Sequence, residues 1–80
     1  MDSTGAIRAM VERSGLSARE ASMLAGRSPD YLGGILYRGS SPSLATAADL
    51  AKACGQVVAI LPNDRVPDCA IVIDPPGEAR

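Results

Sequence analysis

Helix stop signals recur at short intervals along the first 55 residues and leave no room for a long helix. They are Gly15, Gly26, Gly39 and Gly55, and glycine commonly occupies the position just beyond a helix C-terminus. Serines stand at the start of the later segments, and apolar side chains recur within the segments at helical spacing. The pattern predicts a mainly α domain built from four short helices.

The first helix is predicted over about residues 4–14, where Ile7, Met10 and Val11 share one face. The second begins at a capping box, in which the Ser17 hydroxyl accepts from the amide of Glu20 and the Glu20 carboxylate accepts from the amide of Ser17. It extends to Gly26 along a narrow face of small apolar residues: Ala21, Leu24 and Ala25.

A third helix is predicted over residues 29–38, because Ser28 can cap it and Pro29 suits its first turn. Only Arg27 separates Gly26 from this cap. Two helices joined so closely must cross steeply, as they do in a helix-turn-helix motif. The helical wheel buries Leu32, Ile35 and Leu36 and turns the opposite side outward: Asp30, Gly33, Gly34 and Tyr37.

The fourth helix follows a break at residues 39–42, and either Ser41 or Ser43 can cap it. We expect this helix to end at Gly55 and to bury one stripe of residues: Leu44, Ala47, Ala48, Ala51 and Cys54. Residues 1–55 are thus predicted to form the helical core.

The chain changes character after Gly55. Residues 56–61 and 69–73 are short apolar runs rich in β-branched side chains, and they predict a two-stranded antiparallel β-hairpin joined by residues 62–68. Neither run alternates apolar with polar residues, so both faces need cover. We expect the hairpin region, 56–74, to pack on the helices and to form a homodimer interface through Val58, Ile60, Ala70, Ile71, Val72 and Ile73. Residues 75–80 are predicted to be a mobile tail.

Composition narrows the possible chemistry. Eighty residues suffice for one domain, and the sequence has no histidine, the commonest general base and metal ligand. We expect no enzyme, cofactor, metal site or small-molecule ligand. Cys54 and Cys69 can form one disulfide, but without an export signal we expect both to be reduced core residues. No segment approaches the about 20 apolar residues of a membrane span, so we expect a soluble cytoplasmic protein.

Charge is distributed unevenly around a formal net charge of −1. Residues 1–55 carry six basic and five acidic side chains, whereas residues 56–80 carry two basic and four acidic ones. Contacts to phosphate come from lysine and arginine. The balance disfavours a nonspecific polyanion binder and places the basic excess in the helical core.

The stretch from Leu16 to Gly55 resembles the helix-turn-helix of Cro and lambda-type phage repressors, the XRE-type family. The resemblance covers half of the chain and rests on shared spacing of Leu16-Ser17, Glu20, Gly26, Ser28, Tyr31-Leu32, Ile35, Pro42-Ser43-Leu44, Thr46 and Ala51-Lys52-Ala53. It implies a four-helix lambda-repressor-like domain and a dimeric transcription regulator, of phage or mobile-element type. Such a protein places its third helix in the major groove of double-stranded DNA.

Two features depart from the family's pattern. Strands rather than further helices are predicted after the fourth helix, so the family's mode of dimerisation does not carry over. The matching base-contact positions hold Pro29, Asp30, Gly33 and Gly34. Because glycine offers no side-chain hydrogen bond to a base edge, we expect few direct contacts to bases.

The candidate DNA-binding residues lie on the outward sides of the second and third helices and in the segments that adjoin them: Ser17, Arg19, Arg27, Ser28, Pro29, Asp30, Gly33, Gly34, Tyr37, Arg38, Ser40 and Ser41. Arg27 and Arg38 are candidate phosphate clamps, with plain solvated charge as the alternative. Each glycine inside a helix costs roughly 1 kcal/mol relative to alanine. Close approach to DNA, tight contact with another protein, or a shorter helix would each account for Gly33 and Gly34.

The sequence therefore predicts a sequence-specific DNA-binding regulator and leaves one alternative open. The alternative is a protein–protein interaction module, such as an antitoxin or adaptor, built on a helix-turn-helix scaffold. The acidic excess of the chain and the glycines on the outward side of the third helix favour this alternative.

Overall fold

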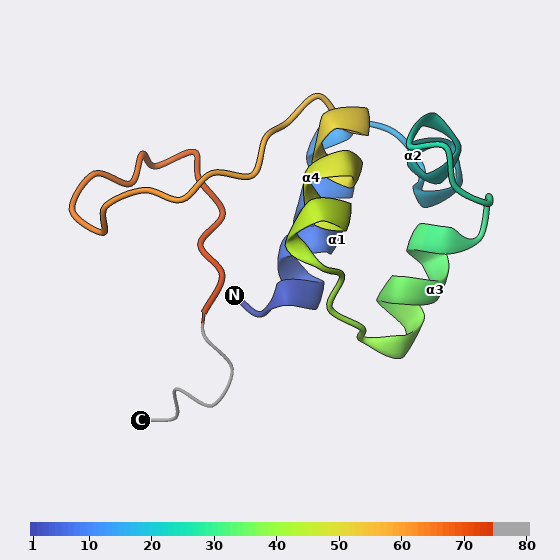
Figure 1. The fold of residues 1–80 in the computed structure, drawn as a ribbon, viewed down its shortest axis with the longest axis horizontal. Helices are drawn as coiled ribbons and strands as arrows, with labels where there is room; N and C mark the ends of the chain where they lie inside the picture. The colour runs from blue at the N-terminus through green and yellow to red at the C-terminus, as the bar shows by residue number, and fades with distance from the viewer. Residues whose placement is uncertain (75–80) are drawn as a thin grey trace.

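Four helices make up the folded part of the protein in the computed structural model, which describes residues 1–74 (Figure 1). They are α1 (Ser3–Ser14), α2 (Ala18–Leu24), α3 (Tyr31–Arg38) and α4 (Leu44–Ala53). The predicted mainly α class with four helices is confirmed. The tail predicted over residues 75–80 lies outside the described residues.

Side-chain caps begin α1, α2 and α4. The Asp2 carboxylate accepts from the Gly5 amide at 2.7 Å, and the Ser43 hydroxyl accepts from the Thr46 amide at 3.2 Å. Of the two serines that can cap the fourth helix, Ser43 is therefore the one that does so. Each cap gives an acceptor to an amide that has no partner within its own helix.

The capping box predicted at the start of α2 is present. The Ser17 hydroxyl accepts from the Glu20 amide at 3.0 Å, and the Ser17 amide donates to the Glu20 carboxylate at 2.9 Å. The second of these bonds is the main cause that lowers the pKa of Glu20. Because the folded pKa is depressed, the contribution of the cap to stability is present at neutral pH and is lost as the pH falls through that pKa.

The start of α3 differs from the predicted one. The helix begins at Tyr31, and its N-cap residue, Asp30, makes no side-chain cap hydrogen bond. Ser28 is therefore not the cap; its carbonyl accepts from the Tyr31 amide at 3.1 Å and closes a turn that occupies residues 29 and 30. The connection between α2 and α3 accordingly runs over residues 25–30 rather than through a single residue.

Gly26 ends α2 in the way that the sequence predicts. Its φ of +75° is left-handed, and its amide donates to the Met23 carbonyl at 3.0 Å. The next amide, that of Arg27, donates to the Ser22 carbonyl at 2.9 Å. This pair of bonds is a Schellman motif, which satisfies carbonyls at the helix end and turns the chain toward α3.

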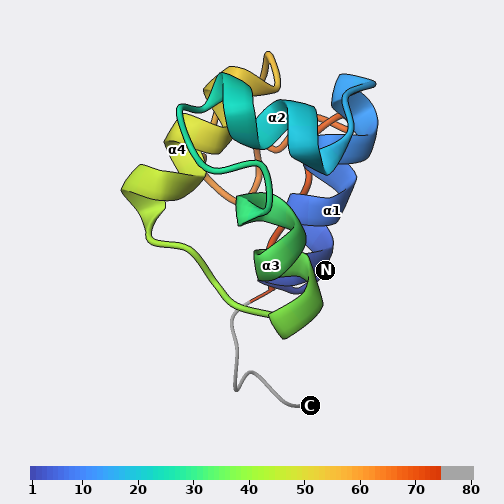
Figure 2. The same ribbon diagram turned by 90° about the vertical axis from the view of Figure 1, so that its right-hand side faces the viewer.

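The core lies where all four helices meet (Figure 2). Leu32 of α3 and Leu50 of α4 are its largest fully buried side chains. With no tryptophan or phenylalanine in the chain, the core is aliphatic and small. Its members are Ile7, Met10, Val11, Ala21, Leu32, Ile35, Leu50, Ala51 and Cys54.

Two of the predicted apolar stripes are partly wrong. Leu24 of α2 and Leu44 of α4 are exposed, as is Ala48, whereas Leu50 and the polar Ser22 are fully buried. Short helices that cross one another touch at one or two turns rather than along a whole face. The point of crossing, and not the helical period alone, therefore selects the buried residues.

Ser22 links the two helices on either side of the turn. Its hydroxyl donates to the Ala18 carbonyl at 2.7 Å and accepts from the Leu32 amide at 3.0 Å. Leu32 is in the first turn of α3, where amides lack partners within the helix. The buried hydroxyl therefore supplies an acceptor that the first turn of α3 needs and ties α3 to the middle of α2.

The hairpin predicted after α4 is not formed among the described residues. Residues 56–74 contain two tight turns, at 63–64 and 68–69, but no strand. The segment, which we call the arm, is held to α1 by hydrogen bonds from Gln56 to the Met10 carbonyl at 2.8 Å and from Arg13 to the Cys69 carbonyl at 2.6 Å. A lone pair of strands is marginally stable without an apolar surface to cover it, and the four helices have already closed the core.

The two cysteines are free thiols in different environments. Cys54 is buried in the core at the end of α4, as predicted, but Cys69 is exposed on the arm. The expectation that both are core residues is wrong for Cys69, because the strand that would have covered it is not formed.

Candidate nucleic-acid interface

One side of α3 is buried and the other forms a ridge on the surface of the protein. Leu32 and Ile35 face the core, whereas Gly33, Tyr37 and Arg38 are exposed, and Tyr37 has 92% of its surface accessible. The predicted division of this helix into inward and outward sides is thus observed, with Leu36 half-buried between them.

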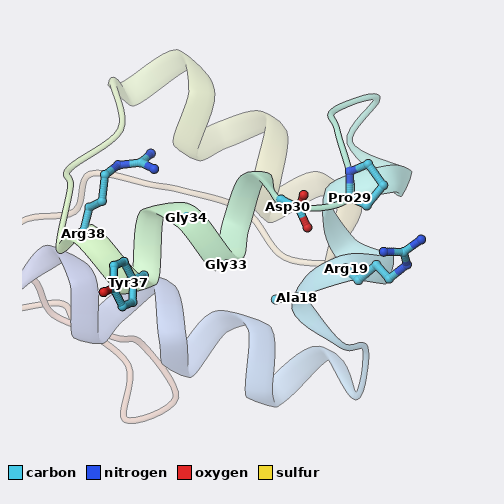
Figure 3. A pocket seen from close by; sticks show the side chains of 8 residues that line it. All are labelled: Ala18, Arg19, Pro29, Asp30, Gly33, Gly34, Tyr37 and Arg38. Carbon is cyan, nitrogen blue, oxygen red and sulfur yellow. The ribbon is translucent and has the colours of Figure 1, made fainter.

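An open hollow of about 550 Å³ lies along this ridge and reaches the first turn of α2 (Figure 3). Seven of the candidate DNA-binding residues line it: Arg19, Pro29, Asp30, Gly33, Gly34, Tyr37 and Arg38. Ala18, at the first position of α2, is the eighth lining residue and was not among the residues predicted from sequence.

Neither glycine of the ridge is required by packing inside the protein. A Cβ placed on Gly33 would have no heavy atom within 4 Å, and the nearest atoms to a Cβ on Gly34 all belong to the Arg38 side chain. Both glycines lie within α3, where each destabilises the helix by roughly 1 kcal/mol relative to alanine. Packing inside the protein therefore does not account for either glycine.

Charges are placed at both ends of the hollow. Figure 3 shows the Arg38 side chain at one end and Arg19 at the other, with Asp30 and Pro29 nearer to Arg19. Guanidinium groups bind phosphate and base-edge acceptors, and a carboxylate accepts from the exocyclic amine of cytosine while it repels phosphate. The hollow therefore presents two cationic donor groups and, near Arg19, one carboxylate acceptor.

Arg27 does not line the hollow. Its guanidinium lies 3.4 Å from the Asp49 carboxylate of α4 and stacks over the Tyr31 ring, 5.0 Å from the ring centre. Tyr31 is half-buried and packs against the core. Arg27 thus braces the turn against α4, while its side chain remains 30% accessible.

The four candidate serines are not gathered at the hollow. Ser17 is engaged as the cap of α2, and Ser28 is exposed in the connection that precedes α3. Ser40 is half-buried after α3, and the Ser41 hydroxyl is hydrogen-bonded to that of Ser3 at the start of α1. The contact between Ser41 and Ser3 joins segments far apart in the sequence, which no local pattern could predict.

The candidate dimer residues lie on the arm and are largely uncovered. Ile60 is 89% exposed, and Val58, Val72 and Ile73 are each about half exposed. Ala70 and Ile71 are half-buried. Apolar side chains therefore remain open to solvent along the arm, which loops away from the helices before it returns toward the N-terminus (Figure 1).

Searches against protein-family models, characterised proteins and solved structures give no match to this chain. None of the helices formed by residues 1–74 is long and apolar enough to cross a membrane.

Proposed function

We propose that this protein is a sequence-specific DNA-binding transcription regulator that inserts α3 into the major groove. The observation that carries the proposal is the ridge of α3, which has glycines that the fold does not need and a cation at each end of its hollow. A backbone without Cβ atoms can approach base edges closely, and the arginines supply phosphate or base contacts. The resemblance to Cro and lambda-type repressors favours repression as the mode of regulation.

The contacts that hold α3 against the other helices support the same proposal. The Leu32 amide is bonded to Ser22 of α2, and the Arg27 side chain braces the turn against α4. A helix that reads base edges must be held at a defined angle by the helices behind it. Both contacts serve to hold α3 in this way.

The proposal is tested by selection of bound fragments from a pool of genomic DNA, followed by mobility shifts across a range of salt concentrations. We expect a small set of related sequences to be retained, with the logarithm of the affinity falling linearly with the logarithm of the salt concentration. If no sequence is enriched over the pool even at low salt, the proposal is wrong.

A matched pair of variants tests whether Arg27 also contacts phosphate. Arg27→Ala and Asp49→Ala both remove the ion pair between the two residues, whose exposed carboxylate limits its worth to at most about 1 kcal/mol. Only Arg27→Ala removes a cation from the surface near α3. We expect Arg27→Ala to weaken DNA binding and to reduce the salt slope by about one, and Asp49→Ala to leave affinity unchanged or raise it. Equal losses in both variants would show that Arg27 acts on the fold alone.

We further propose that the protein works as a homodimer, joined through the arm. In the dimer, residues 56–61 and 69–73 form the strands that the sequence predicts and pair across the two copies. Support comes from the exposed apolar side chains of Val57 and Ile60 and from the lack of strand pairing within residues 56–74. A second copy supplies the apolar cover that a lone hairpin lacks.

Ile60→Asp tests the dimer without threatening the monomer fold, because 89% of the Ile60 surface is already exposed. Losing the burial of one isoleucine weakens an interface by about 2–3 kcal/mol, or roughly 100-fold in dissociation constant. We expect sedimentation equilibrium to show a dimer for the unaltered chain at micromolar concentration and a monomer for Ile60→Asp, with equal helical circular dichroism. Leu44→Asp, a change at an exposed leucine outside the arm, is the control that stays dimeric. A monomeric unaltered chain would refute the dimer.

The second candidate function is a protein-interaction module, and the exposed apolar arm is the observation that favours it. In that case the arm engages a different protein and the α3 ridge is surface only. Co-purification of a single heterologous partner that is lost in Ile60→Asp, together with no enrichment of DNA, would establish this function in place of the first.

A further inference from the structure

The Arg38 side chain does not extend away from the end of α3 but folds back along it. A Cβ on Gly34, one turn earlier, would lie 2.8 Å from Nη1 of Arg38 and 3.5 Å from its Cζ and Nη2 (Figure 3). A separation of 2.8 Å is shorter than real Cβ contacts allow. The guanidinium thus occupies space that a side chain at position 34 would fill, so with an alanine there this flexible end of the arginine would have to shift.

The hydrogen-bond donors of Arg38 are not used within the described part of the chain. The ion pairs recorded among residues 1–74 join Met1 to Asp74 and Arg27 to Asp49, and the side-chain hydrogen bonds likewise leave Arg38 out. A guanidinium carries five N–H donors in a rigid planar fork. The group therefore lies on the helix surface with its fork free for a ligand.

The place of this guanidinium favours a base over a phosphate. Phosphates flank the major groove, whereas base edges lie at its floor and face the middle of an inserted helix. By folding back over Gly34, Arg38 brings its fork from the end of α3 to the middle of the ridge. At the adjacent Gly33, an added Cβ would have no heavy atom of the protein within 4 Å. This part of the helix surface is therefore open, and its backbone can come close to the bases.

We propose that Gly34 is a positioning residue that aims Arg38 at a guanine in the major groove, where the guanidinium donates to O6 and N7 in a bidentate contact. This pairing matches the fork geometry, and guanine is the base that presents two adjacent acceptors. The inference rests on the proposed function and replaces the predicted role of Arg38 as a phosphate clamp. It predicts that the DNA site contains one guanine whose recognition requires both Gly34 and Arg38.

The test replaces the guanines of a selected DNA site one at a time with 7-deazaguanine, which lacks the N7 acceptor and keeps Watson–Crick pairing. For the unaltered protein we expect about a tenfold loss of affinity at one guanine. Arg38→Ala should bind the unmodified site about tenfold more weakly and show no further loss with 7-deazaguanine. Gly34→Ala should behave in the same way, although it keeps the arginine.

Gly33→Ala is the matched control, because it makes the same chemical change at the adjacent residue without touching Arg38. We expect Gly33→Ala to retain the tenfold penalty at the same guanine, whatever its overall affinity. Both glycine variants should melt at a higher temperature than the unaltered protein, because alanine is the better helix former. A loss of discrimination in Gly34→Ala therefore cannot come from unfolding.

Different results of this experiment reject the guanine contact and the proposed DNA-binding function. Selective DNA binding in which no guanine shows a 7-deazaguanine penalty overturns the inference and leaves the proposed function standing. A penalty that persists in Arg38→Ala or in Gly34→Ala also overturns it. If no DNA is selected, and an acidic protein is instead bound through Arg38, the proposed function fails and the inference fails with it.

Discussion

Leu50→Ala is expected to lower the free energy of unfolding by about 2–5 kcal/mol, because a fully buried leucine is removed from a small aliphatic core. An 80-residue domain has a total stability of about 4–12 kcal/mol. The loss is thus a large fraction of the whole. Urea denaturation followed by circular dichroism at 222 nm measures it, as a fall in the midpoint with an unchanged slope.

Leu44→Ala is the matched control for this prediction. Leu44 lies in the first turn of the same helix and is 72% exposed, so its truncation should change stability by less than about 0.5 kcal/mol. The helical period alone predicted the reverse, with Leu44 in the buried stripe. Equal midpoints for the two variants, or a larger drop for Leu44→Ala, would contradict the packing of α4 described above.

Ser22→Ala is expected to destabilise the protein by about 1–3 kcal/mol. The change leaves the Leu32 amide buried without its acceptor and the Ala18 carbonyl without its side-chain donor. Alanine is the better helix former by roughly 0.5 kcal/mol, which offsets only part of this cost. Thermal denaturation measures the net effect, and hydrogen exchange should show that the Leu32 amide loses protection.

Ser28→Ala is the control for the second prediction. The sequence marks Ser28 as a helix cap, but in the structure it is exposed and α3 begins three residues later. We expect a change of less than about 0.5 kcal/mol. If Ser22→Ala instead raises the melting temperature, helix propensity outweighs the hydrogen bond, and Ser22 does not fix α3 to α2.

Local signals predicted the helices well. The capping box at Ser17 and Glu20, the cap at Ser43 and the left-handed glycine at position 26 are all present. Each of these signals acts between residues only a few positions apart, so both partners of the interaction are present in a short stretch of sequence. The cap predicted at Ser28 failed because a turn over Pro29 and Asp30 delays the helix.

Only part of the candidate site was predicted, because local spacing does not show contacts between distant segments. The outward side of α3 follows from its helical period once the inward side is known, and its residues do line the hollow. Arg27 and Ser41 were assigned to the same surface, but their partners are Asp49 and Ser3, from distant helices. The position of the Arg38 guanidinium beside Gly34 depends on the conformation of the arginine side chain, which sequence spacing does not predict.

Taken alone, the sequence determined where helices begin and end and which side of α3 turns outward, because caps, glycines and the helical repeat operate over a few residues. Tertiary structure decided that Leu50 rather than Leu44 enters the core, that a buried Ser22 holds α3, and that residues 56–74 form no strands. These outcomes depend on where helices cross and on whether an apolar surface finds cover, and both are properties of several segments packed together.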